Sequence, residues 1–128
     1  MIGYVTIGTD DLDRAAGFYD QLLGELGAQR FMENERIVAW SAGEGTPGVG
    51  VCKPFDGSPA SVGNGSMVSL AAGGTEQVQA LHAKALELGG TDEGAPGLRF
   101  GQFYGAYFRD LDGNKLCAFC MVPEEESA

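Results

Sequence analysis

Two segments of the chain place apolar residues at the three- and four-residue spacing typical of a helix buried along one side. The first follows Asp10 and Asp11, which offer an N-cap, and is expected to end at Gly27. The second runs from about Thr75 to Leu88. Each segment is long enough for about three to four helical turns, so we expect two amphipathic helices.

Short runs rich in β-branched and aromatic residues surround both predicted helices. In the first half they cover residues 2–9, 29–32, 37–41 and 49–53; in the second half they lie just before the helix, near Thr91, and at 102–109 and 115–121. Each half therefore reads β-α-β-β-β.

The clearest local signal is the turn Asp110-Leu111-Asp112-Gly113-Asn114, which lies between two of these runs. An Asp-Gly pair flanked by apolar runs predicts a β-hairpin, because glycine adopts the positive φ that tight turns need. One strand should end near Arg109 and the next should begin at Lys115. Side chains alternate along that second strand. We expect Lys115, Cys117, Phe119 and Met121 to share one face.

The two halves repeat one another. An offset of 63 residues lays Tyr4–Gly27 on Met67–Gly90 without a gap, and it matches Val5 with Val68, Leu23 with Leu86 and Gly27 with Gly90. Such internal similarity indicates a duplicated module. We predict one domain made of two modules, 1–56 and 64–122, with a linker at 57–63 and an acidic tail at 123–128.

Composition excludes several classes of function. With 18 acidic against 8 basic residues and a net charge of −10, the chain is unsuited to nucleic acid or to anionic membrane surfaces. It has no apolar run of about 18 residues, so no membrane partner is expected. The three cysteines lack the spacing of a disulfide framework, which predicts a reducing, cytoplasmic location.

With these features together, the chain resembles the vicinal oxygen chelate superfamily, which includes glyoxalase I, extradiol dioxygenases and bleomycin-resistance proteins. The segments that carry the resemblance are Val5-Thr6-Ile7 through Asp11-Leu12, Phe18-Tyr19 to Gly24, Val78 to Gly90, Ala95-Pro96-Gly97-Leu98-Arg99, and the Asp110–Asn114 turn. The resemblance implies an α+β fold in which the sheets of two β-α-β-β-β modules curl around one cavity, with the helices outside. It also implies a homodimer.

The resemblance places metal ligands on the first and last strands of each module. The matching residues here are Tyr4, Met67 and Cys117, and the late position of the first module aligns best with Val49 or Val51. A phenol, a thioether and one thiol are a poor donor set for the divalent metals that bind histidine and carboxylate. We therefore predict no metal site and no cofactor.

The same alternation predicts a cavity face that is aromatic, rich in sulfur and sparsely polar, which is typical of small-molecule sites. Its predicted residues are Tyr4, Thr6, Trp40, Met67, Ser69, Cys117 and Phe119, with Arg99 in a loop at the rim. Arginine is suited to an anionic group on the ligand. The expected partner is a small molecule that is partly apolar or aromatic.

Three other interpretations remain open from the sequence: a metal-dependent lyase or dioxygenase, a metal-free enzyme that uses Tyr4 or Cys117, and a structural or interaction protein. His82, the single histidine, lies on the second helix, and we expect it to be a hydrogen-bonded core residue. Cys117 and Cys120 spell C-x-x-C, but on a strand residues three apart point to opposite faces. We therefore expect no redox pair.

Overall fold

The chain forms two compact units, divided between Gly63 and Asn64. The computed structural model describes residues 1–124, so the end of the predicted acidic tail, 125–128, lies outside the described residues. Within residues 1–124, neither helix is long and apolar enough to span a membrane.

The first unit is built from β1 (Tyr4–Gly8), α1 (Leu12–Gly24), β2 (Gln29–Glu33), β3 (Ile37–Ser41) and β4 (Gly48–Cys52). Its strands form a four-stranded mixed sheet in the order β1-β4-β3-β2. β1 and β4 are parallel, and the other neighbours are antiparallel. The α1 crossover makes the parallel pair possible, because two parallel strands cannot be joined by a tight turn.

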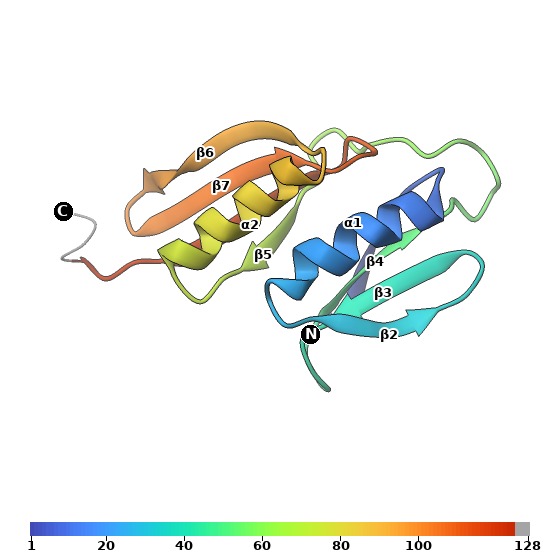
Figure 1. Cartoon of the computed structure of the whole chain (residues 1–128), viewed down its shortest axis with the longest axis horizontal. Helices are drawn as coiled ribbons and strands as arrows, with labels where there is room; N and C mark the ends of the chain where they lie inside the picture. Colours follow the sequence, from blue (N-terminus) through green and yellow to red (C-terminus); the bar gives the residue numbers. More distant parts are fainter. Residues whose placement is uncertain (125–128) are drawn as a thin grey trace. The chain divides into compact units, whose positions relative to one another are not determined.

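Helix α1 lies across one face of this sheet (Figure 1). It begins where the Asp11 side chain accepts a hydrogen bond from the Arg14 backbone N–H at 3.1 Å, as the sequence predicted. The chain leaves the helix through Gly27, whose φ of +74° suits glycine. The apolar side of α1 packs against β3, where the Tyr19 ring meets the Trp40 ring at 5.8 Å.

The second unit repeats this plan with β5 (Val68–Ala71), α2 (Thr75–Glu87), β6 (Thr91–Phe100), β7 (Phe103–Arg109) and β8 (Lys115–Met121). The strand order is β5-β8-β7-β6, with β5 parallel to β8. Helix α2 covers one face of this sheet (Figure 1). The α+β fold of two β-α-β-β-β modules is therefore confirmed, and each sheet is open and four-stranded.

The turn Asp110–Asn114 joins β7 to β8 as predicted, with Gly113 at φ +89°. It sets the antiparallel register in which Arg109 pairs with Lys115 and Tyr107 pairs with Cys117. The duplication is also visible in the helices. Helix α1 starts at Leu12 and helix α2 starts at Thr75, which is the 63-residue offset of the repeat.

The core of each unit lies between its helix and its sheet. His82 is buried on α2, where its Nε2 lies 3.0 Å from Asp92 Oδ1 and its ring meets Phe108 edge to face. It is thus a hydrogen-bonded core residue, as predicted. The 63-residue repeat pairs His82 with Tyr19, and these two residues occupy the same place in the two modules.

One local assignment from the sequence is wrong. Arg99 lies in β6 rather than in a loop, because β6 extends as far as Phe100. After α2 the left-handed conformation belongs to Gly89, with φ +102°, one residue before the Gly90 that the repeat aligns with Gly27.

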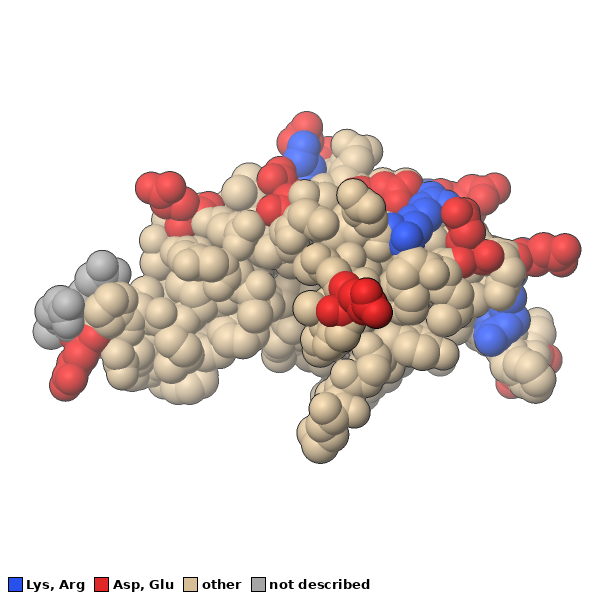
Figure 2. Space-filling view, turned by 90° about the horizontal axis from the view of Figure 1, so that it is seen from below, with Lys and Arg blue, Asp and Glu red and all other residues tan. Residues whose placement is uncertain are grey.

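Acidic residues outnumber basic residues by 18 to 8. In the view of Figure 2 most of the acidic side chains gather along the upper edge, with fewer basic ones among them. This agrees with the net charge of −10. Against such a background, any group of basic side chains without acidic partners is unusual.

Candidate functional site

The two faces of the first sheet differ in what covers them. Trp40 faces α1, because its indole packs on Tyr19 and its Nε1–H donates to Asp20 Oδ1 at 2.8 Å. Trp40 is only 1% exposed. Since Trp40 pairs with Val49 and Tyr4 pairs with Gly48, Tyr4 points to the opposite face. The prediction that Trp40 shares a face with Tyr4 is wrong; Trp40 belongs to the core under the helix.

The strand register also changes which residue of the first module stands at the expected metal-ligand position on its last strand. Ser69 pairs with Cys117 in the second sheet, and its counterpart Thr6 pairs with Gly50 in the first. The equivalent of Cys117 is therefore Gly50, rather than Val49 or Val51. Val51 is fully buried, and alternation places it on the helix side with Trp40. Glycine offers no side-chain donor.

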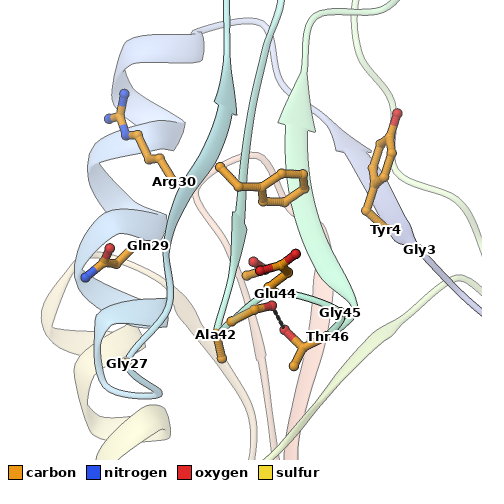
Figure 3. Close-up of a pocket in the computed structure, with 12 residues that line it drawn as sticks. Gly3, Tyr4, Gly27, Gln29, Arg30, Ala42, Glu44, Gly45 and Thr46 are labelled. Atoms are coloured by element: carbon orange, nitrogen blue, oxygen red, sulfur yellow. Dashed lines mark hydrogen bonds between the residues drawn. The ribbon is translucent and has the colours of Figure 1, made fainter.

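A hollow of about 750 Å³ opens at the end of the first sheet. Figure 3 shows Gln29 and Arg30 on one side of it, Tyr4 on the other, and Glu44 and Thr46 on the loop between them. Phe31 also lines this hollow, and its ring meets the Tyr4 ring edge-on at 6.2 Å. Gly48 leaves room for the Phe31 ring, since a β-carbon at Gly48 would lie 2.7 Å from that ring.

The charge of Arg30 is already neutralised at this hollow. Its guanidinium donates to Asp20 at 2.7 and 2.9 Å and to Glu33 at 2.8 Å. The hydrogen bond from Arg30 is the main cause that lowers the pKa of Asp20, with burial opposing it. The hollow therefore offers two aromatic rings and polar loop groups, but no unpaired arginine for an anion.

The face of the second sheet away from α2 carries several polar and charged side chains. Ser69, Cys117 and Tyr107 stand side by side there on β5, β8 and β7. Two cations flank the phenol ring: the Arg99 guanidinium is 5.4 Å from the ring centroid and the Lys115 ammonium 5.5 Å. We call Ser69, Arg99, Tyr107, Lys115 and Cys117 the Tyr107 cluster.

The Cys117 thiol and the Tyr107 phenol both keep their protons at neutral pH. Burial raises the pKa of the Cys117 thiol, while its interactions with the Ser69 and Tyr107 hydroxyls act in the opposite direction. Burial also raises the pKa of Tyr107 above its ordinary value. Both groups are therefore neutral near pH 7, so the cluster presents a thiol, a phenol and two cations.

A neutral, buried Cys117 should react slowly with alkylating agents, because the thiolate is the reactive form. Cys117 is 0% exposed, whereas Cys52 is partly exposed. We expect iodoacetamide at neutral pH to label Cys52 at least about tenfold faster than Cys117, as read by peptide mass spectrometry. Unfolding in urea should remove the difference. Equal labelling rates in the folded protein would instead support a nucleophilic role for Cys117.

Next to the Tyr107 cluster lies a stack of phenylalanine rings. Phe100 and Phe103 stack at 4.8 Å with 11° between their planes, and Phe103 and Phe119 stack at 5.1 Å with 7° between theirs. Gly105 makes the stack possible, because a β-carbon there would lie 2.7 Å from the Phe103 ring. Phe100 is 68% exposed. We call Phe100, Phe103 and Phe119 the phenylalanine shelf.

Of the residues predicted from the sequence, the structure therefore groups Ser69, Arg99, Cys117 and Phe119 on one face of the second sheet. Tyr4 and Thr6 share the corresponding face of the first sheet, and Met67 is a half-exposed residue just before β5. Sequence reasoning missed Tyr107 and Phe103 as site residues. The hairpin turn held the signal for Tyr107, because pairing Arg109 with Lys115 places Tyr107 opposite Cys117.

The residues at the expected metal positions do not suit a divalent metal. Tyr4 supplies a phenol, Met67 a thioether and Cys117 a buried neutral thiol, while the fourth position is Gly50. Within residues 1–124 no three histidine, cysteine or acidic side chains group in a way that could hold a metal ion. This donor set lacks the histidine and carboxylate ligands that zinc, nickel or iron would use.

Comparison with known proteins agrees with this architecture. Residues 1–118 match the family model described as the Glyoxalase/Bleomycin resistance protein/Dioxygenase superfamily. The chain therefore belongs to this superfamily. No functionally curated protein matches it significantly.

Solved structures give the same result. A glyoxalase/bleomycin resistance protein from Albidiferax ferrireducens T118 is 39% identical, with a TM-score of 0.86 over 95% of this chain and 99% of that one. A hypothetical protein from S. aureus is 26% identical, with a TM-score of 0.73 over 94% and 92% of the two chains. A family enzyme from Burkholderia phytofirmans PsJN, at 18% identity, shares the fold with a TM-score of 0.75 over 94% and 98%.

Proposed function

We propose that this protein binds a small, partly aromatic molecule, and that the phenylalanine shelf of the second module is where the aromatic part rests. The stack of Phe100, Phe103 and Phe119 carries the proposal. Parallel rings stack favourably in offset arrangements, and the exposed Phe100 leaves an apolar surface in contact with water. A planar ligand would cover that surface.

The donor set supports binding or positioning rather than chemistry at a metal. The positions where the family relationship would place ligands hold Tyr4, Met67, Cys117 and Gly50, none of which is a histidine or a carboxylate. Cys117 is buried and neutral, which also argues against its use as a nucleophile. A homodimer and a cytoplasmic location remain part of the proposal. The three free cysteines support a reducing compartment.

The test is a calorimetric titration with 2-naphthamide and with its saturated analogue, decahydronaphthalene-2-carboxamide. The aromatic amide should bind more tightly. Phe100→Leu, which keeps an apolar side chain but removes the exposed ring, should weaken naphthamide binding about two- to tenfold, the effect of losing one stacked pair. Thermal unfolding of the variant checks that the fold is intact.

Phe55→Leu is the matched control. Phe55 is highly exposed in the first module, outside the shelf, and lies against Arg36. This variant should bind naphthamide like the wild type. If the saturated and aromatic amides bind equally, or if Phe100→Leu behaves like Phe55→Leu, the shelf does not bind aromatic ligands and the proposal fails.

A further inference from the structure

The Tyr107 cluster places two cations against one ring. Among the described cations, Arg30, Lys84 and Arg109 each pair with a carboxylate, whereas Arg36 and Lys53 have none within ion-pair distance. Neither Arg99 nor Lys115 has a carboxylate partner within residues 1–124, although acidic residues outnumber basic ones by 18 to 8 in the chain. In so acidic a protein, two unpaired cations on one ring need an explanation.

Two glycines of β6 leave open the space that the Arg99 guanidinium occupies, and we call this space the seat of Arg99. A β-carbon at Gly97 would lie 3.0 Å from Nη1 of Arg99, and one at Gly94 would lie 3.2 Å from Nη2. The guanidinium thus occupies space that two missing side chains leave open, and it donates one hydrogen bond to the Ala95 carbonyl. Most of its five N–H donors have no role in that bond. Arg99 is therefore positioned over Tyr107 by its strand.

Arg99 and Lys115 repel each other across the ring that both contact. Each lies about the same distance from the Tyr107 centroid, so their charges are no farther apart than the sum of 5.4 and 5.5 Å. An anion bound beside the ring, within reach of both side chains, would offset this repulsion and would gain charge-assisted hydrogen bonds. The neutral hydroxyl groups of Tyr107 and Ser69 add further donors at the same place.

The cluster is also next to the shelf. Cys117 and Phe119 are two residues apart on β8, on the same face, and Phe103, Gly105 and Tyr107 follow one another on that face of β7. Residues two apart on a strand are separated by about 6.6 Å. One small molecule can therefore contact the phenylalanine shelf with a ring and the Tyr107 cluster with a substituent on that ring.

We propose that the Tyr107 cluster binds an anionic group, so that the ligand of the second module is an aromatic acid, with its carboxylate held by Arg99 and Lys115. The choice of an aromatic acid rests on the proposed function. The anion site itself rests on the unpaired cations and on the seat that Gly94 and Gly97 provide. A carboxylate suits the planar fork of Arg99, which can donate two parallel hydrogen bonds to it.

The test compares 2-naphthoate with 2-naphthamide, which has nearly the same shape but no charge. We expect the full-length protein to bind naphthoate at least about tenfold more tightly in calorimetry at low salt, the effect of one charge-assisted hydrogen-bond pair. Added sodium chloride should reduce the preference. Arg99→Gln and Lys115→Gln should each reduce it, and the double variant should bind acid and amide within about twofold.

Arg36→Gln is the matched control, because Arg36 also lies over an aromatic ring, at 5.5 Å from Phe55, but in the first module. It removes the same charge and should leave the acid preference unchanged. Equal binding of acid and amide by the wild-type protein would overturn the anion site and leave the aromatic site standing. The same conclusion follows if the double variant keeps the preference.

A saturated acid separates the two proposals. If decahydronaphthalene-2-carboxylate binds as tightly as naphthoate and loses affinity in Arg99→Gln, the anion site stands and the aromatic site fails. If none of the four compounds binds, both proposals are wrong.

Discussion

Replacing Trp40 by alanine should lower the free energy of unfolding by about 3–5 kcal/mol, the usual cost of removing a large aromatic side chain from a core. The indole is almost completely buried between β3 and α1, against Tyr19. Its loss would leave a cavity and would also remove the 2.8 Å hydrogen bond to Asp20. Urea unfolding followed by circular dichroism measures the change, because the variant lacks the only tryptophan.

Trp40→Phe is the informative control for that experiment. Phenylalanine keeps a buried ring against Tyr19 but cannot donate to Asp20. We expect a smaller loss of about 1–2 kcal/mol, from the missing hydrogen bond and the reduced ring volume. A loss below about 1 kcal/mol in Trp40→Ala would mean that Trp40 is not a core residue, and the face assignment from the sequence would then regain support.

The local features of the fold were predictable because short-range physics determines them. Asp11 caps α1 with a hydrogen bond to a residue three positions on, and Gly113 supplies the positive φ of the hairpin turn. The apolar spacing of 3 and 4 identifies the buried side of each helix without reference to the sheet. The 63-residue repeat then follows from aligning the apolar pattern of the first helix with that of the second.

The faces of β3 were not predictable in the same way. All four residues from Ile37 to Trp40 are buried, so the strand has no alternation of apolar and polar residues to mark its two faces. Only the pairing of Trp40 with Val49, and the position of α1, decide which side Trp40 occupies. An aromatic residue on such a strand is therefore as compatible with the helix-covered core as with a ligand site.

The candidate site depends on register between strands that are distant in sequence. Gly50 replaces Val49 and Val51 as the counterpart of Cys117 because β1 and β4 pair in parallel, and local sequence does not fix that register. The seat of Arg99 depends on irregular pairing of β6 with β7 around Gly94 and Gly97. Bulges of this kind change which side chains approach one another, and they have no simple periodic signal.

Replacing Asp110 by alanine should lower the free energy of unfolding by about 3 kcal/mol, the effect of removing a buried, multiply hydrogen-bonded carboxylate. Asp110 is only 4% exposed. Its carboxylate accepts hydrogen bonds from the backbone N–H groups of Asp112 and Asn114, both at 2.9 Å, and from the Asn114 side-chain amide at 3.0 Å. Alanine would leave these donors in the turn without their acceptor. Urea unfolding monitored by circular dichroism gives the value.

Asp56→Ala is the matched control, because Asp56 makes the same kind of bond, to the Ser58 N–H two residues on, in an exposed turn. Water can replace that acceptor, so we expect a loss below about 0.5 kcal/mol. If Asp110→Ala costs no more than Asp56→Ala, the buried turn does not stabilise the hairpin. The comparison also bears on the ligand site, since this turn holds Arg109 opposite Lys115 and thereby sets Tyr107 beside Cys117. A weakened turn should therefore lower the affinity for naphthoate together with the stability.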